Sequence, residues 1–309
     1  MTTQAPVLTT HNLTKRYGGR TAVDGLTMEL PRGVVAGFIG PNGAGKTTTM
    51  AMLLGLVRPT AGEGTVLGRS LSHPERYVSR VGALLEGPAL WPSLTGHENL
   101  QVLARLGGHD PRRVPEVLRL VGLADRGGDR FGTYSLGMKQ RLGIAAALLG
   151  EPELLILDEP TNGLDPAGMS DMRDLISRLA AEDRSVLVSS HLLGELEQVC
   201  DWLLIIEQGR LAYAGPAGEF ATRSGAELVL FPAEQADLER LATVVANEGL
   251  AAERAGDHLV VPLGERDPRL AAATVNRAAA NAGLLLAELR IDRPTLESTY
   301  LRMIEGEPA

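Results

Sequence analysis

An α/β fold with a largely parallel sheet is predicted by three features of the sequence. Apolar runs of strand length alternate with helical segments, the order that produces parallel sheets. The run "LLILD" at 154–158 is continuously apolar, as expected of a strand buried on both faces. A glycine-rich loop at 40–47 separates the apolar strand "VVAGFIG" from the helical segment "TTTMAML". We therefore expect one such sheet in the first two thirds of the chain.

The first domain, placed at residues 1–218, is expected to begin with two strands, at 7–17 and 26–39. The helix after the glycine-rich loop is expected to continue through "TTTMAMLLGLV" and to close at Arg58-Pro59, because proline disfavours continuation of a helix. Short strands and loops are predicted for 65–94.

Residues 95–150 contain helical patterns without intervening strands, so they are predicted to form a helical subdomain that projects from the sheet. Thr95 and Glu98 have the spacing of a capping box. Asp110 is expected to cap the next helix, and Ser135 the last one.

The α/β pattern resumes after this subdomain. The expected elements are the strand at 154–158, a helix at about 169–182, the strand "SVLVSS", a short helix through Cys200, the strand at 202–207 and a hairpin turn at Gly209-Arg210.

A second, small α+β domain is predicted at 225–309. Its pattern is strand, helix, strand, strand, helix, strand, which is the order of a ferredoxin-like fold, followed by a last helix at about 294–305. Nothing in this domain has a catalytic pattern, so we expect an accessory role.

Composition narrows the range of functions and partners that this chain can have. The net charge of −8 argues against a nucleic-acid partner bound through a broad basic surface. Cys200 is the only cysteine, which excludes an intrachain disulfide and fits a reducing compartment. No run approaches the roughly 18 apolar residues of a membrane helix, and "MTTQAPVL" lacks the features of a signal peptide. We expect a chain that reaches a membrane only through a partner.

The loop at 40–47 matches the phosphate-binding pattern Gly-x-x-x-x-Gly-Lys-Ser/Thr in full, in the required strand–loop–helix context. Its backbone N–H groups are expected to surround a polyphosphate, with Lys46 on the β and γ oxygens and Thr47 as a ligand of Mg²⁺. The alternative, a chance glycine-rich turn, does not account for the flanking elements. The predicted nucleotide-binding residues are Gly40, Pro41, Asn42, Gly43, Ala44, Gly45, Lys46, Thr47 and Thr48.

Asp158 and Glu159 end the apolar strand that follows the helical subdomain. An Asp-Glu pair at a strand end is most often a solvated turn. Downstream of a complete phosphate loop, Asp158 is expected to hold Mg²⁺ and Glu159 to polarise the attacking water.

From about residue 7 to 215 the chain resembles the nucleotide-binding subunits of ABC transporters. The resemblance is carried by the phosphate loop, by "LLILDEPTNGLDP" at 154–166 and by "YSLGMKQRLGIA" at 134–145. It implies that Tyr17 stacks on adenine, that His191 contacts the γ-phosphate and that Ser135 and Gly137 contact the nucleotide of a second subunit. Each of these roles has an alternative. Tyr17 could serve only in packing, His191 could take a surface or core position, and Ser135 could be a plain N-cap.

Two positions depart from the family pattern. Tyr134, Leu136 and Met138 replace three residues of the usual Leu-Ser-Gly-Gly-Gln signature, whereas Ser135 and Gly137 keep its hydroxyl and backbone contacts. Glu86 stands at or near the usual glutamine, so we predict it as a further metal ligand that adds negative charge beside the γ-phosphate. Both variants resemble the bacterial drug, bacitracin and lantibiotic exporters.

The resemblance thus implies an ATPase that uses ATP and Mg²⁺, pairs with a second copy of itself or a paralogous subunit, and powers export through a separate permease at the cytoplasmic face of the cell membrane. The loop at 86–94 is expected to contact that permease, unless its apolar "PALWP" forms only a local core. Two alternatives remain: an importer subunit with a regulatory C-terminal domain, and a soluble ATPase acting on ribosomes or DNA. A GTPase is disfavoured because no Asn-Lys-x-Asp motif occurs.

Overall fold

The computed structural model describes residues 5–180, 184–191, 194, 199–222, 225–264, 266–292 and 295–305. The chain divides into two compact units, Met1–Ala217 and Gly218–Ala309. The described helices include none that is long and apolar enough to cross a membrane.

The first unit contains a six-stranded sheet with the order β10-β9-β3-β8-β7-β6. Its members from β9 to β6 pair in parallel, and only the edge strand β10 is antiparallel. β3 and β7 are continuously apolar, and every residue of β3, β7 and β8 is buried. The predicted α/β fold class is confirmed. The bounds are β3 Val35–Ile39, β6 Val81–Leu84, β7 Leu154–Leu157, β8 Ser185–Ser190, β9 Trp202–Glu207 and β10 Arg210–Pro216.

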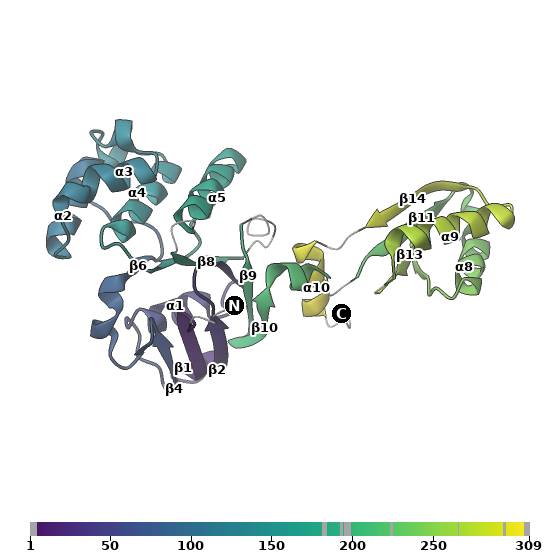
Figure 1. Ribbon diagram of the computed structural model, residues 1–309, viewed down its shortest axis with the longest axis horizontal. Coiled ribbons are helices and arrows are strands. Elements are labelled where there is room, and N and C mark those ends of the chain that lie inside the picture. The colour runs from purple at the N-terminus through teal and green to yellow at the C-terminus, as the bar shows by residue number, and fades with distance from the viewer. Residues whose placement is uncertain are drawn as a thin grey trace. The chain divides into compact units, whose positions relative to one another are not determined.

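A second, antiparallel sheet has the order β2-β1-β4-β5. Its buried side chains join those of the six-stranded sheet and of α1 in one core. In Figure 1 the six-stranded sheet lies between this antiparallel sheet and the helices α2 to α5. The bounds are β1 Leu8–Tyr17, β2 Arg20–Leu30, β4 Ala61–Val66 and β5 Arg69–Ser70.

The prediction of a single strand at 26–39 is wrong. The chain turns at 31–34, where Gly33 has φ +69°, so that β2 joins the antiparallel sheet and β3 the parallel one. The Gly33 N–H is bonded to the Ser185 hydroxyl at 2.9 Å, which fixes this crossing between sheets. Apolar pattern alone does not reveal such a change of sheet.

The helices of the first unit largely follow the expected positions, and α2 to α4 form the helical subdomain. Thr95 and Glu98 make the predicted capping box, and the side chains of Asp110 and Ser135 cap their helical segments. α1 is shorter than expected because Gly55, at φ +72°, follows its end. The short helix predicted through Cys200 falls largely outside the described residues. The bounds are α1 Lys46–Leu53, α2 Gly96–Leu106, α3 Val114–Leu120, α4 Leu136–Leu148 and α5 Pro166–Ala180.

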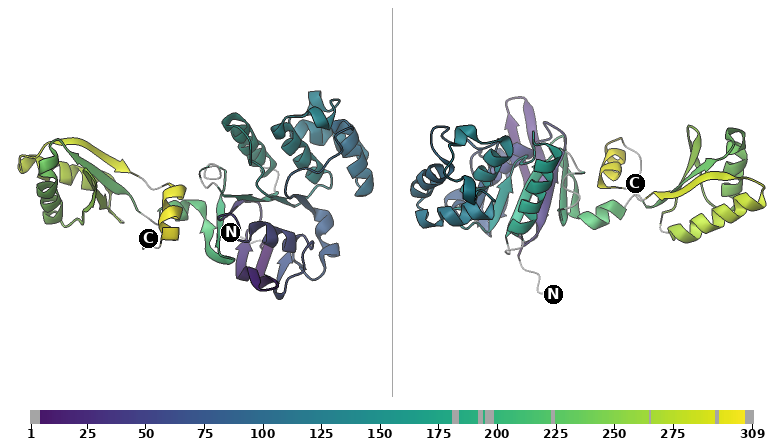
Figure 2. Two further views of the ribbon diagram at one scale, coloured as in Figure 1. Left: turned by 180° about the vertical axis from the view of Figure 1, so that it is seen from behind. Right: turned by 90° about the horizontal axis from the view of Figure 1, so that it is seen from above.

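The second unit contains an antiparallel sheet with the order β12-β13-β11-β14. Helices α8 and α9 lie on one face of this sheet (Figure 2), and their apolar residues share one core with it. Element order and pairing are those of the predicted ferredoxin-like fold. The bounds are α7 Ala217–Thr222, β11 Glu227–Pro232, α8 Leu238–Asn247, β12 Glu253–Ala255, β13 His258–Pro262, α9 Pro268–Asn281, β14 Leu286–Asp292 and α10 Leu296–Glu305.

Candidate nucleotide-binding site

The glycine-rich loop joins the buried strand β3 to α1, and two of its glycines are required by close backbone contacts. A Cβ on Gly40 would lie 2.3 Å from the Ile206 carbonyl oxygen, and one on Gly45 would lie 2.5 Å from the Ala22 carbonyl oxygen. Gly45 also has φ +106° and precedes the first residue of α1. The loop is therefore wedged between β9 and β2, with its backbone free to surround an anion at the start of α1.

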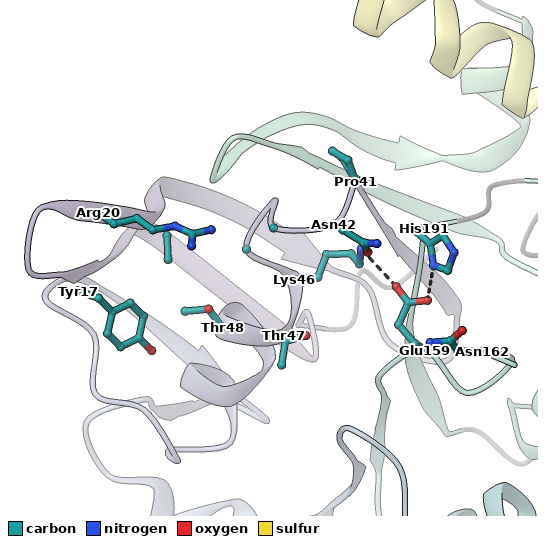
Figure 3. Close-up of a pocket in the computed structure, with 13 residues that line it drawn as sticks. Tyr17, Arg20, Pro41, Asn42, Lys46, Thr47, Thr48, Glu159, Asn162 and His191 are labelled. Carbon is teal, nitrogen blue, oxygen red and sulfur yellow. Dashed lines mark hydrogen bonds and ion pairs between the residues drawn. The ribbon is translucent and has the colours of Figure 1, made fainter.

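Lys46 is buried, yet its ammonium reaches the cavity that the loop encloses. Its Nζ donates a hydrogen bond to the Gly40 carbonyl oxygen at 2.6 Å and lies 3.3 Å from Oε1 of Glu159. Figure 3 shows Lys46 and Glu159 pointing toward one another across the cavity. The cation is thus held between the loop and the end of β7.

Asp158 directly follows β7 and is buried. Its carboxylate accepts hydrogen bonds from the Thr47 hydroxyl at 2.7 Å and from the Ser189 hydroxyl. The Ser189 oxygen in turn accepts the N–H of Glu159 at 2.9 Å. Because β7 and β8 are parallel neighbours, these side chains meet at the carboxyl edge of the sheet, beside α1.

Glu159 has φ +48°, a left-handed conformation that costs a non-glycine residue about 1–3 kcal/mol. Its Oε2 lies 2.7 Å from Nδ1 of His191, which follows β8. The carboxylate therefore stands between His191 and the Lys46 ammonium, and both point at the same space (Figure 3).

These groups surround a cavity of about 590 Å³, within the range of small-molecule sites. Most of the predicted nucleotide-contacting residues line it, with Gly40 and Ala44 forming the loop behind them. The lining residues are Tyr17, Arg20, Ala22, Pro41, Asn42, Gly43, Gly45, Lys46, Thr47, Thr48, Glu159, Asn162 and His191.

Three predicted residues lie elsewhere. Glu86 is exposed, has φ +54° and is not among the residues that line this cavity. Ser135 and Gly137 line a different cavity of about 540 Å³, together with Leu164 and Asp165. One copy of the chain therefore does not bring its signature residues to its own phosphate loop.

Sequence reasoning missed Arg20, Ala22 and Asn162 as lining residues. The spacing could have identified Arg20, since two glycines separate it from Tyr17 and a two-residue hairpin places the flanking residues opposite one another.

The residues present fit a magnesium nucleotide. The Thr47 hydroxyl and the Asp158 carboxylate are adjacent oxygen donors, the type that Mg²⁺ prefers. The Lys46 ammonium lines the same cavity as Thr47 and supplies a cation for phosphate oxygens. A parallel sheet with this loop at one strand end and an acidic pair at the next strand but one defines a P-loop ATPase.

Comparison with known proteins gives the family. The ABC transporter family model matches residues 23–162. The bacitracin transport ATP-binding protein BcrA of Bacillus licheniformis is 47% identical over 208 residues, which cover 66% of this chain and 68% of that protein. The daunorubicin resistance ATP-binding protein DrrA3 of Streptomyces coeruleorubidus is 35% identical over 96% of this chain and 95% of its own.

A solved structure of an ATP-binding subunit of an ABC transporter is 32% identical and superimposes with a TM-score of 0.62, covering 69% of this chain and 91% of that one. The chain belongs to the ATP-binding proteins of the ABC transporter family, and the predicted ATP-binding transporter subunit and ATPase activity are confirmed.

Proposed function

We propose that this chain hydrolyses ATP to drive export of a drug, antibiotic or other hydrophobic compound through a separate membrane permease. The proposal depends on one observation: Lys46, Thr47, Glu159 and His191 line the same cavity, and Asp158 is hydrogen-bonded to the Thr47 hydroxyl beside it. The direction and substrate class rest on relatives named for bacitracin transport and daunorubicin resistance.

Binding starts from the two ends of the cavity. The ring of Tyr17, which is 49% exposed, is available to stack on adenine, a contact of about 1–3 kcal/mol per base. The loop N–H groups and the Lys46 ammonium hold the β and γ oxygens. Asn42 and Thr48 complete the wall around the phosphates.

Hydrolysis is assigned to Glu159. Its carboxylate orients a water molecule and accepts its proton while the oxygen attacks the γ-phosphorus and the bond to the β–γ bridging oxygen breaks, which leaves ADP and phosphate. His191, beside the same carboxylate, donates to a γ-phosphate oxygen through its other ring nitrogen. Thr47 and Asp158 would hold Mg²⁺, which when bound neutralises charge on the phosphates, and Glu86 is retained as a further ligand that would join only after its loop moves.

A second subunit completes the site. Ser135 caps α4 by accepting the Met138 N–H, and with Gly137 it lines a cavity different from the one beside the chain's own phosphate loop. Head-to-tail pairing with a second copy or a paralogue would bring Ser135 and Gly137 to the γ-phosphate of the first. ATP then favours the closed pair, and its hydrolysis releases it.

The permease contact is assigned to the loop at 86–94. Trp91 in this loop is 44% exposed, although its backbone is held in place by the buried Asn99. The Asn99 side chain accepts the Trp91 N–H at 2.8 Å and donates to the carbonyl oxygens of Trp91 and Leu94. An apolar ring on a rigid support suits a partner helix, and this contact would hold the chain at the cytoplasmic face of the membrane.

The domain boundaries are part of the proposal, with ATP binding at 1–218 and an accessory domain at 225–309. The ferredoxin-like topology of the second unit keeps one rival function open, an importer subunit regulated through this domain. A role on ribosomes or DNA has no support from the net charge of −8.

The test is transport. A photo-cross-linker placed at position 91 is used to capture the multi-span membrane partner, which is then purified. Both proteins are reconstituted in vesicles loaded with bacitracin or daunorubicin. ATP-dependent movement toward the side opposite the ATPase, lost in Lys46→Ala, is expected. Movement toward the ATPase side would establish import, and ATP turnover without movement of either compound would reject the substrate class.

A further inference from the structure

Arg20 lies directly opposite Tyr17 at the end of the β1–β2 hairpin. The two residues are Cα partners across a turn made of Gly18 and Gly19. Directly opposed residues of an antiparallel pair project from the same face, so the guanidinium and the ring are both presented to the cavity, which they line together. Figure 3 shows the Arg20 guanidinium extending from the hairpin toward the phosphate loop.

The position of Arg20 relative to the loop is fixed by backbone packing. The Gly45 backbone touches the Ala22 carbonyl so closely that a Cβ would lie 2.5 Å away. Gly209 bridges the same elements, donating to the Ala44 carbonyl oxygen at 3.0 Å and accepting the Asp24 N–H at 2.8 Å. A Cβ on Gly43 would lie 3.6 Å from Nη2 of Arg20. The guanidinium therefore lies beside Gly43, on the side of the loop that faces the β1–β2 hairpin.

Within the described part of the chain, the Arg20 side chain makes no ion pair or hydrogen bond. Asp24, the nearest acid along β2, is paired with Arg210 at 2.7 Å. Lys15 donates to the Arg58 carbonyl oxygen at 2.7 Å. An unpaired guanidinium facing a phosphate-type cavity has a geometry suited to a phosphate oxygen.

We propose that Arg20 binds a phosphate oxygen of the nucleotide on the side of the loop nearer the base, opposite the Lys46 ammonium. This inference rests on the proposed nucleotide site. The hairpin then makes two contacts with the nucleotide: the Tyr17 ring stacks on the base, and Arg20 binds the phosphate chain. Arg20 is a binding residue and takes no part in proton transfer.

The test compares Arg20→Gln with Arg16→Gln. Arg16 is exposed and adjacent to Tyr17 but does not line the cavity, so its variant removes the same charge from the same hairpin. Competition against a fluorescent ATP analogue measures affinity for ATP, ADP and adenosine. Arg20→Gln should weaken ATP and ADP about five- to tenfold and adenosine less than twofold, and Arg16→Gln should weaken none of them by more than twofold.

Two further readouts separate a phosphate contact from damage to the hairpin. The loss in Arg20→Gln should shrink between about 50 mM and about 500 mM salt, and Arg20→Lys should restore part of the affinity. In steady-state turnover the KM for ATP should rise with little change in kcat, because the contact is present in both ground and transition states.

Unchanged ATP affinity in Arg20→Gln, or an equal loss for adenosine, would overturn the inference about Arg20. Lys46→Ala distinguishes this from failure of the nucleotide site. If Lys46→Ala abolishes ATP binding while Arg20→Gln binds normally, only the role of Arg20 is rejected. If Lys46→Ala also binds ATP normally, the site itself is misassigned.

Discussion

The Thr47 hydroxyl donates a 2.7 Å hydrogen bond to the Asp158 carboxylate, although 111 positions separate the two residues. The first stands at the start of α1 and the second at the end of β7. This contact joins the phosphate loop to the acidic strand end and makes them parts of one site.

Removing this hydrogen bond should affect both stability and metal dependence. In Thr47→Ala the buried Asp158 keeps only Ser189 among these partners, and losing a partner of a buried carboxylate costs about 1–3 kcal/mol. Denaturant unfolding should show this loss, and half-maximal ATPase activity should require more Mg²⁺. Thr47→Ser keeps the hydroxyl and is the control. Equal magnesium curves for Thr47→Ala and the parent chain would argue against Thr47 as a ligand.

Lys46→Ala should abolish nucleotide binding, because no other cation stands between Gly40 and Glu159 in the described site. Titration with a fluorescent ATP analogue measures the affinity. Circular dichroism serves as the control for folding, since the alanine leaves Glu159 without its ammonium partner. Undiminished affinity in the folded variant would refute the assigned role of the loop.

Glu159→Gln should bind ATP, pair and barely hydrolyse. Glutamine keeps the size of the side chain but does not accept the proton of the attacking water, so turnover should fall by about 10²- to 10⁴-fold. Size-exclusion chromatography with ATP should show the dimer accumulating. A variant that stays monomeric with ATP and turns over normally would contradict both the catalytic and the pairing assignments.

Gly40→Ala should destabilise the protein although Gly40 is not in a left-handed conformation. Its added Cβ would lie 2.3 Å from the Ile206 carbonyl oxygen in the backbone of β9, and such overpacking typically costs about 1–3 kcal/mol. Gly128→Ala, where a Cβ meets open space, is the matched control. The midpoint of thermal unfolding is measured for both variants. A steric cost predicts a larger drop in Gly40→Ala, whereas a general effect of replacing glycine predicts equal drops in the two variants.

Cys200 should be unreactive in the folded chain. Burial, followed by the charge of Asp201, raises the pKa of its thiol from 9.0 to about 12. The thiolate fraction at pH 8 is then about a thousandfold lower than in the unfolded chain, and alkylation should slow accordingly. Because only the unfolded thiol ionises above pH 9, stability should fall as the pH rises through that range. Rapid native-state labelling at pH 8, measured by mass spectrometry, would contradict this burial.

The sequence by itself determined the chemistry and most of the fold. The loop Gly40–Thr47, the strand before Asp158 and the helix caps at Thr95 and Ser135 are local patterns, in which each residue type is required by its own neighbours. The ferredoxin-like order of the second unit followed from periodicity in the same way.

Only the tertiary structure decided which distant residues meet. The entry of Arg20 into the cavity depends on how β2 packs against the phosphate loop. The break at Gly33 lets β2 and β3 join different sheets, and Glu86 stays outside the cavity in the loop after β6. Ser135 likewise faces a separate cavity although its cap was correctly predicted. Hydrogen bonding and side-chain periodicity act over a few residues, whereas these placements arise from close packing between segments far apart in the chain.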